Sequence, residues 1–137
     1  MKDGLEECYR ILKSTGAIYL HCDWHASYYL TVEMDRIFGI KTFSNNIVWS
    51  YEGGGRSKSS NFARKHDDIL FYSKSDEWTF NMNEVLLPHT KAQLSRYNIE
   101  KDGKRFANMK GKMRELGEGK IPSDTWIDIP PLSCNEK

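Results

Sequence analysis

The most reactive side chains of the sequence stand together near its start, at His21, Cys22, Asp23 and His25. Imidazole, thiolate and carboxylate groups are the usual ligands of zinc. The first three residues are consecutive, however, and successive side chains of a strand point to opposite faces, so they do not all converge on one ion. We predict no metal site here. Asp23 either lines a pocket or caps the helix that follows, and the pattern allows both.

A second candidate group is basic and lies between residues 53 and 65. Three glycines open this segment, and it contains no Asp or Glu. Its spacing does not match the G-x-x-x-x-G-K-[ST] phosphate loop. Contact with a DNA phosphate backbone and a simple solvated surface loop explain it equally well. Its basic residues are Arg56, Lys58, Arg64 and Lys65.

The common enzyme signatures do not occur in the sequence. The G-x-S-x-G, H-E-x-x-H and G-x-G-x-x-G patterns are all missing. Readings as a serine hydrolase, a zinc protease or a dinucleotide-binding enzyme therefore have no support. We assign no catalytic residue.

The elements that would position the candidate residues follow a helix, strand, helix order. Apolar residues at helical spacing from Leu5 to Leu12 predict a first helix. Residues 17–22 form an apolar run that is typical of a strand buried on both faces. A second apolar stripe from Ala26 to Phe38 predicts another helix, which Gly39 ends. This order predicts an α/β fold with a doubly wound, parallel sheet.

Two further strands are predicted at residues 46–51 and 68–73, which are rich in β-branched and aromatic residues. No helical period separates them, so we expect neighbouring antiparallel strands. Alternation places Ile69 and Phe71 on one face and Leu70 and Tyr72 on the other.

The composition changes from residue 88 onward. Residues 91–120 carry nine Lys or Arg against four Asp or Glu, with few apolar residues. We expect a basic, weakly cored appendage with one helix near residues 91–97. The predicted boundary separates residues 1–87 from residues 88–137.

Overall composition places few further limits on function. The net charge is +1, so binding to nucleic acid would depend on local clusters. The three cysteines have no C-x-x-C spacing, which favours a reducing compartment. No apolar run reaches the roughly 18 residues of a membrane span, so we expect a cytoplasmic protein without a membrane partner.

Most of the chain resembles the amino-methylating DNA methyltransferases of restriction-modification systems, in the permuted group whose catalytic motif precedes its cofactor motif. The matching segments occur in the family's order. They are residues 15–23 (Thr-Gly-Ala-Ile-Tyr-Leu-His-Cys-Asp), 27–30, 34–39, 46–51, 53–56, 62–75 and 126–131.

The resemblance implies a partial Rossmann-like sheet with antiparallel last strands. It also implies an S-adenosylmethionine-dependent activity on adenine N6 or cytosine N4 of double-stranded DNA. The family's Asp-Pro-Pro-Tyr motif and Phe-x-Gly-x-Gly cofactor loop are not in this sequence. We expect them before Met1 and after Lys137. We therefore expect this polypeptide alone neither to bind the cofactor nor to methylate DNA.

The resemblance also assigns candidate site residues. Residues 1–87 would be part of the catalytic domain, with Asp23, His21 and Tyr72 at the target-base pocket; core packing is the equal alternative for Tyr72. Residues 88–137 would be part of the target-recognition region and an extended tail. The expected DNA contacts are Arg56, Lys58, Arg64, Lys65, Lys104, Arg105, Lys110 and Lys112.

Several hypotheses follow for the polypeptide. The leading hypothesis is that the polypeptide is part of an adenine-N6 methyltransferase and is inactive alone. The exposed edge strand of its sheet would then pair with a second copy or with a complementary methyltransferase fragment. Such a fragment would make it half of a split enzyme. The alternatives are a non-catalytic DNA-binding module and a remnant without a role.

Overall fold

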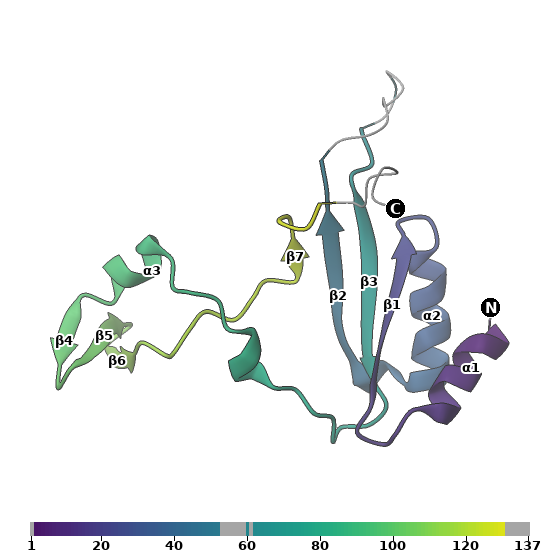
Figure 1. Cartoon of the computed structure of the whole chain (residues 1–137), viewed down its shortest axis with the longest axis horizontal. Helices are drawn as coiled ribbons and strands as arrows, with labels where there is room; N and C mark the ends of the chain where they lie inside the picture. Colours follow the sequence, from purple (N-terminus) through teal and green to yellow (C-terminus); the bar gives the residue numbers. More distant parts are fainter. Residues whose placement is uncertain (1, 53–59, 61, 131–137) are drawn as a thin grey trace. The chain divides into compact units, whose positions relative to one another are not determined.

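The computed structural model describes residues 2–52, 60 and 62–130, and it forms two compact units. The first unit comprises residues 1–79 and 123–137, and the second comprises residues 80–122. These bounds differ from the predicted boundary at residues 87 and 88. The difference arises because the chain returns to the first unit after residue 122. Figure 1 shows the elements of both units in sequence colours.

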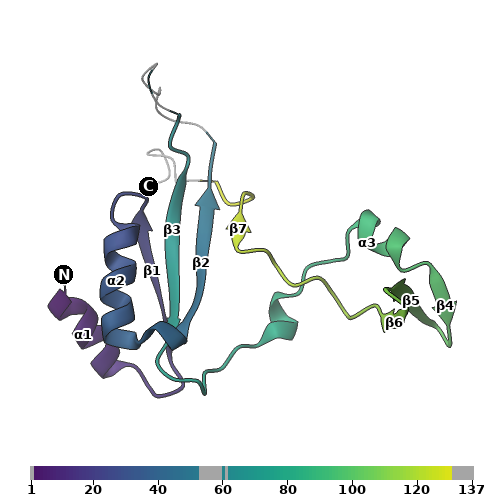
Figure 2. The same cartoon turned by 180° about the vertical axis from the view of Figure 1, so that it is seen from behind.

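The first unit contains a four-stranded sheet in the order β1-β3-β2-β7. Its strands are β1 (Ala17–Asp23), β2 (Phe43–Ser50), β3 (His66–Ser73) and β7 (Thr125–Trp126). The central strand β3 pairs antiparallel with both β1 and β2. The antiparallel pairing of β2 with β3 was predicted from the sequence. The short strand β7 pairs parallel with β2. The arrowheads of β1 and β2 therefore end at the same edge of the sheet (Figures 1 and 2).

Two helices, α1 (Lys2–Ile11) and α2 (Ser27–Phe38), pack against one face of this sheet. Their bounds agree with the helical periods in the sequence. Each apolar side chain that is fully buried contributes about 1.5–3 kcal/mol to folding. The core that joins the helices to the sheet consists of Leu5, Cys22, Leu30, Met34, Phe38, Leu70 and Tyr72.

A hydrogen-bonded turn joins β1 to α2. One carboxylate oxygen of Asp23, Oδ1, accepts hydrogen bonds from the backbone N–H groups of His25 (3.1 Å) and Ala26 (2.9 Å). Asp23 thus closes the turn before the helix. It does not cap α2, because the N-cap residue is Ala26 and no side chain caps this helix. Gly39 follows the helix with φ +96° and donates its N–H to the Asp35 carbonyl. A left-handed φ of this kind favours glycine.

Two expectations about β1 were wrong. In the described residues β1 has one strand neighbour, β3, and that pairing is antiparallel rather than parallel. The strand is also not buried on both faces, because Tyr19 and His21 are exposed on the side away from the helices. An apolar run predicts a strand, but the covering of its second face depends on residues far away in the sequence.

The second unit is a small sheet with one short helix. The helix α3 (Lys91–Arg96) is capped by Thr90 and Gln93, and the strands β4 (Ile99–Lys101), β5 (Lys104–Met109) and β6 (Lys112–Glu115) pair antiparallel in sequence order. Both connecting turns have positive φ at two residues, Asp102-Gly103 and Lys110-Gly111, as tight hairpins require. Within residues 80–122 only Ala107 is buried, so the unit is weakly cored, as predicted. Two single 3₁₀ turns, η1 (Ile40–Thr42) and η2 (Met82–Val85), complete the elements.

Candidate functional site

The carboxyl ends of β1 and β2 and the start of β3 bring aromatic and ionisable side chains to one edge of the sheet. In the register of the sheet, Asp67 of β3 is the partner of both Asp23 of β1 and Trp49 of β2. His21 and Trp49 lie on the sheet face away from the helices, with their rings 5.7 Å apart. In open α/β sheets, ligands bind beyond the carboxyl ends of the strands. This edge is therefore the candidate site.

The carboxylate of Asp67 is held by two neighbouring side chains. One oxygen, Oδ2, lies 3.1 Å from His21 Nε2, and the other, Oδ1, accepts a hydrogen bond from the Tyr51 hydroxyl at 3.3 Å. The side chain of His21 is 54% exposed and that of Asp67 is 21% exposed. Burial, and then the charge and hydrogen bond of Asp67, raise the pKa of Tyr51. Tyr51 therefore stays protonated at neutral pH and donates to Asp67.

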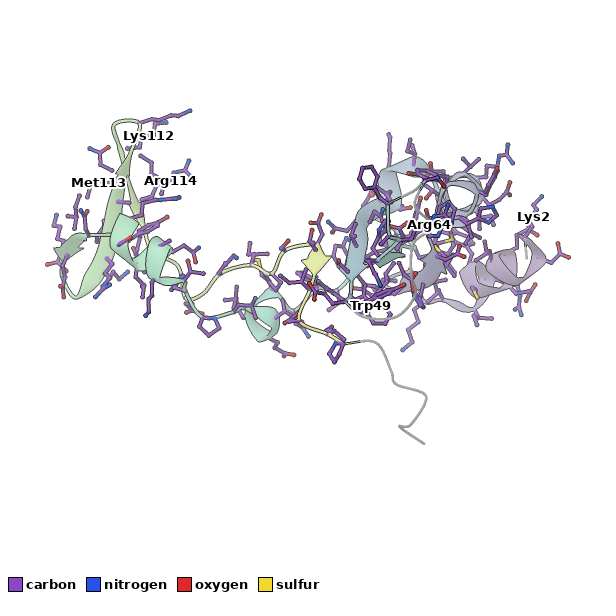
Figure 3. The ribbon with its side chains drawn as sticks, turned by 90° about the horizontal axis from the view of Figure 1, so that it is seen from above. Lys2, Trp49, Arg64, Lys112, Met113 and Arg114 are labelled. Carbon is purple, nitrogen blue, oxygen red and sulfur yellow. The ribbon has the colours of Figure 1, made fainter. Side chains whose placement is uncertain are left out.

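The Trp49 indole is fixed from two sides. Its Nε1–H donates to the backbone carbonyl of Ile129 at 2.8 Å, in the segment that follows β7. The Tyr51 ring meets it at 5.4 Å and 62°, and the His21 ring meets it at an angle of 58°. Neither contact is parallel stacking. Figure 3 shows Trp49 and Arg64 on this unit.

On the helix side of the same edge, a groove of about 780 Å³ runs between α2 and β2. The guanidinium of Arg64 lies over the Trp24 ring, 3.9 Å from its centroid. Asp68 lies in the groove, 6% exposed, and accepts a hydrogen bond from Asn46 Nδ2 at 3.1 Å. The groove is lined by Trp24, Ser27, Tyr28, Thr31, Val32, Phe43, Asn46, Val48, Arg64, His66 and Asp68.

The thiol of Cys22 packs on this side of the sheet and is unsuited to nucleophilic chemistry. Burial, followed by the charges of Asp68, Asp23 and Asp67, raises the pKa of Cys22 to about 11. A thiolate is the reactive form of cysteine. At neutral pH Cys22 is thus an inert part of the core.

The three predicted pocket residues do not come together on one face. His21 belongs to the cluster around Asp67, and Asp23 uses Oδ1 in the turn before α2. Tyr72 is fully buried under α2 on the opposite face, where its hydroxyl donates to Asp35 Oδ1 at 2.7 Å. For Tyr72 to reach a base, α2 would have to move away. Sequence reasoning did not select Trp49, Tyr51 or Asp67, although the i, i+2 spacing of the first two places them on one strand face.

The predicted DNA contacts lie on both units. Arg56 and Lys58 are outside the described residues, while Arg64 and Lys65 precede β3. In the second unit Lys104 forms an ion pair with Glu115 at 2.7 Å, and Arg105 follows it on β5. The turn between β5 and β6 carries a groove of about 390 Å³, lined by Met109, Lys110, Lys112 and Arg114. Figure 3 labels Lys112 and Arg114.

Metal and membrane features are absent from the described parts of the chain. Across residues 2–52, 60 and 62–130, no three His, Cys, Asp or Glu side chains are grouped so that they could hold a metal ion. In the same part of the chain, no helix combines the length and apolar character needed to span a bilayer.

Comparison with known proteins gives consistent matches to DNA-modifying enzymes. The profile of a family described as DNA methylase matches residues 1–136. The Type II methyltransferase M.HpaI of Haemophilus parainfluenzae is 34% identical over 87 residues, or 63% of this chain and 27% of that protein. The Type II methyltransferase M.BglII of Bacillus subtilis is 28% identical over 133 residues, or 89% and 33%. The DNA adenine methyltransferase YhdJ of Escherichia coli is 25% identical over 127 residues, or 92% and 39%.

Proposed function

Because the chain belongs to the DNA methylase family, we propose that it acts as part of a site-specific enzyme that methylates adenine N6 in double-stranded DNA. The chain spans between 27% and 39% of the length of the relatives described above, so the activity of a whole enzyme is a proposal for it. The name of the Escherichia coli relative, a DNA adenine methyltransferase, supports adenine over cytosine N4 as the target.

The edge where β1 and β2 end supports this proposal most strongly. Trp49 and Asp67 lie at this edge on the face away from the helices, and Arg64 lies over Trp24 on the helix side. A base that is to be modified must leave the duplex stack, and rings and hydrogen-bonding groups are what receive it. We place this sheet in the last part of a Rossmann-like sheet, since antiparallel β3 lies between β1 and β2.

The basic residues of both units are the proposed contacts to the DNA backbone. Arg64 and Lys65 would act beside the sheet edge, and Arg56 and Lys58 beside them in sequence. The second unit would form part of the target-recognition region, with its exposed cations on β5, on β6 and in the turn between them. Phosphate contacts position the DNA, while contacts to base edges specify the sequence. The proposed contacts of this unit are Lys104, Arg105, Lys110 and Lys112.

Members of this family generally use S-adenosylmethionine as methyl donor, but the turn from β1 into α2 does not fit that group. The turn from β1 into α2 contains Trp24 and no glycine, so its backbone offers no close approach to a ligand. The Asp23 carboxylate there is already engaged with two backbone N–H groups. We assign no residue to the cofactor and derive no step through it. We propose that the polypeptide alone does not transfer methyl groups.

We propose a partner because one side of strand β1 is unpaired. In the described residues β1 pairs on one side only, and an unpaired strand edge invites pairing with another chain. The proposed partner is a second copy or a complementary methyltransferase chain. We propose the cytoplasm as its location.

Two measurements with the purified chain test the proposed function. Duplex DNA binding, followed by fluorescence anisotropy, should weaken by about a thousandfold between 50 and 200 mM salt if roughly six phosphates are contacted. Radiolabelled S-adenosylmethionine should transfer no label to the duplex. Absence of duplex binding at low salt would contradict the proposal. Binding that no added methyltransferase chain converts into methyl transfer would instead favour a non-catalytic DNA-binding module.

A further inference from the structure

We infer that the groove between α2 and β2 binds a short segment of a partner protein that carries a Lys or Arg beside apolar residues. The basic side chain would reach Asp68 on the floor of the groove, and the apolar residues would pack on its walls. This inference goes beyond the proposed function, which gives no role to the floor of the groove or to its helix wall.

The floor of the groove carries a buried carboxylate that is incompletely paired. Asp68 lies on the helix side of β3 and is 6% exposed. Among the described residues, its carboxylate has one hydrogen bond, from the neutral amide of Asn46 at 3.1 Å. In the same part of the chain, no ion pair joins it to a Lys, Arg or His. Buried charges are normally paired with an opposite charge, so a cationic donor from another molecule suits this position.

The walls of the groove are apolar and open to solvent. Tyr28 and Val32 lie one turn apart on α2 and are 79% and 50% exposed. Phe43 lines the groove from the start of β2 and is 39% exposed. Neighbouring exposed apolar side chains with polar groups around them mark interaction sites. The walls therefore favour a partner that brings apolar surface of its own.

The sheet register places the carboxylate between an apolar end and a cationic end of the groove. Val48 of β2 is the partner of Asp68, whereas Phe43 lies at the apolar end. Arg64, at the other end, is held over the Trp24 ring. A segment that lies in the apolar end therefore reaches the carboxylate before it meets a like charge. The volume of about 780 Å³ is within the range of ligand sites.

Floor and walls together determine the chemistry of the ligand. A small amine would pair with Asp68 but leave the apolar walls in water. A purely apolar segment would cover the walls but shut the carboxylate away without a donor, which costs free energy. Lys and Arg side chains combine an apolar stem with a charged end. A basic residue flanked by apolar residues therefore satisfies both parts of the groove.

The test uses fluorescein-labelled heptapeptides with blocked ends, in which one Lys is flanked by Leu, Val or Phe. Each peptide is compared with the same peptide carrying acetyl-lysine, which keeps the stem and removes the charge. Anisotropy gives a Kd for each peptide with the full chain. Acetylation should weaken binding by about tenfold to a hundredfold, as expected for the loss of a hydrogen bond between charged groups.

Two variants separate the floor from the walls. Asp68→Asn removes the charge and keeps the size of the side chain, so it should abolish the difference between the Lys and acetyl-lysine peptides. Tyr28→Ala should weaken binding of both peptides about fivefold. Tyr29→Ala is the matched control, because Tyr29 is the next residue on α2 and is 75% exposed, but it lines the cavity toward α1.

Circular dichroism melting identifies variants that fail to fold. If Asp68→Asn does not fold, the acetyl-lysine peptide still tests the carboxylate on the unaltered chain, and the exposed Tyr28 still tests the wall. Equal affinity of the wild-type chain for Lys and acetyl-lysine peptides, or a preference for Lys that persists in Asp68→Asn, would overturn the role of Asp68.

Other results would remove the groove itself from the interaction. Failure of every Lys peptide to bind, or equal losses in Tyr28→Ala and Tyr29→Ala, would overturn the inference. Sedimentation of the wild-type chain and both variants tests a second copy as the occupant. Self-association that Tyr28→Ala abolishes and Tyr29→Ala retains would assign the groove to another copy of this chain and contradict the proposed partner.

Discussion

The guanidinium carbon of Arg64 lies 3.9 Å from the centroid of the Trp24 ring, so a cation is held over an aromatic face where β1 ends and β3 begins. Such a contact contributes about 0.5–1 kcal/mol at exposed sites. It restricts the side chain while leaving its charge at the sheet edge. The arrangement suits a residue that must meet a phosphate in a defined place.

Replacing Arg64 with alanine should weaken duplex binding by a similar factor for every DNA sequence. The slope of log affinity against log salt should fall by about one, because one phosphate contact is lost. Salt titrations by anisotropy provide the measurement. Arg36→Ala is the control, since Arg36 is paired with Glu33 on α2. An unchanged slope in Arg64→Ala would remove this residue from the interface.

The second unit should contribute phosphate contacts of its own. The double variant Lys112→Ala and Arg114→Ala should lower the salt slope by about two, because both cations border the same groove. Lys2→Ala is the control, as Lys2 is paired with Glu6 on α1 at 3.6 Å. Salt titration of duplex binding by anisotropy measures the slope for the double variant and for the control. If the double variant and the control give identical slopes, the unit does not contact the DNA backbone.

Asp23→Ala should destabilise the chain by about 1 kcal/mol, since two backbone N–H groups lose their acceptor. Asp23→Asn, which keeps a side-chain oxygen, should lose less. Urea denaturation followed by circular dichroism measures both variants. A fold of unchanged stability with impaired DNA binding would instead assign Asp23 to the base pocket, as the family resemblance implies.

Tyr72→Phe should cost about 1 kcal/mol of stability through loss of the hydrogen bond to Asp35, and it should leave DNA binding unchanged. Tyr72 is fully buried beneath α2, so its removal is expected to act on the core. Urea denaturation and anisotropy are measured on the same preparation. Weaker DNA binding without a stability change would support the pocket role of Tyr72.

Alkaline pH should destabilise the fold partly through Cys22, whose pKa is raised from 9.0 to about 11. The unfolded chain releases this proton at lower pH than the folded chain does. The resulting contribution to stability is complete below pH 9 and declines as the pH rises toward 11. Urea denaturation at pH 8, 9 and 10 should show a smaller decline for Cys22→Ala than for the wild-type chain. Parallel curves for the two proteins would contradict this assignment.

Local periodicity was sufficient to predict α1, α2, α3 and the antiparallel pairing of β2 with β3. It failed for the environment of β1, because neither the direction of its neighbour nor the exposure of Tyr19 and His21 is encoded within residues 17–22. Those properties depend on pairing with residues about 50 positions later in the chain.

The contacts of the candidate site could not be predicted from local sequence patterns either. The contact between His21 and Asp67 depends on the register that sets His21 opposite Ile69, and no local pattern specifies that register. Trp49 was predicted within a strand, but its fixation by Ile129 comes from a segment far away in sequence. The resemblance to DNA methyltransferases identified the correct family, yet it could not indicate which side chains meet in space.

The fourth strand of the sheet belongs to a segment that follows the whole second unit, so the first unit is discontinuous in sequence. During synthesis, β1, β2 and β3 leave the ribosome well before Thr125 and Trp126 are made. The side of β2 that later pairs with β7 therefore stays unpaired while residues 80–122 are synthesised. The second unit, by contrast, pairs its strands in sequence order and can close as it is translated. Within residues 2–130, β7 is thus the last strand to join this sheet.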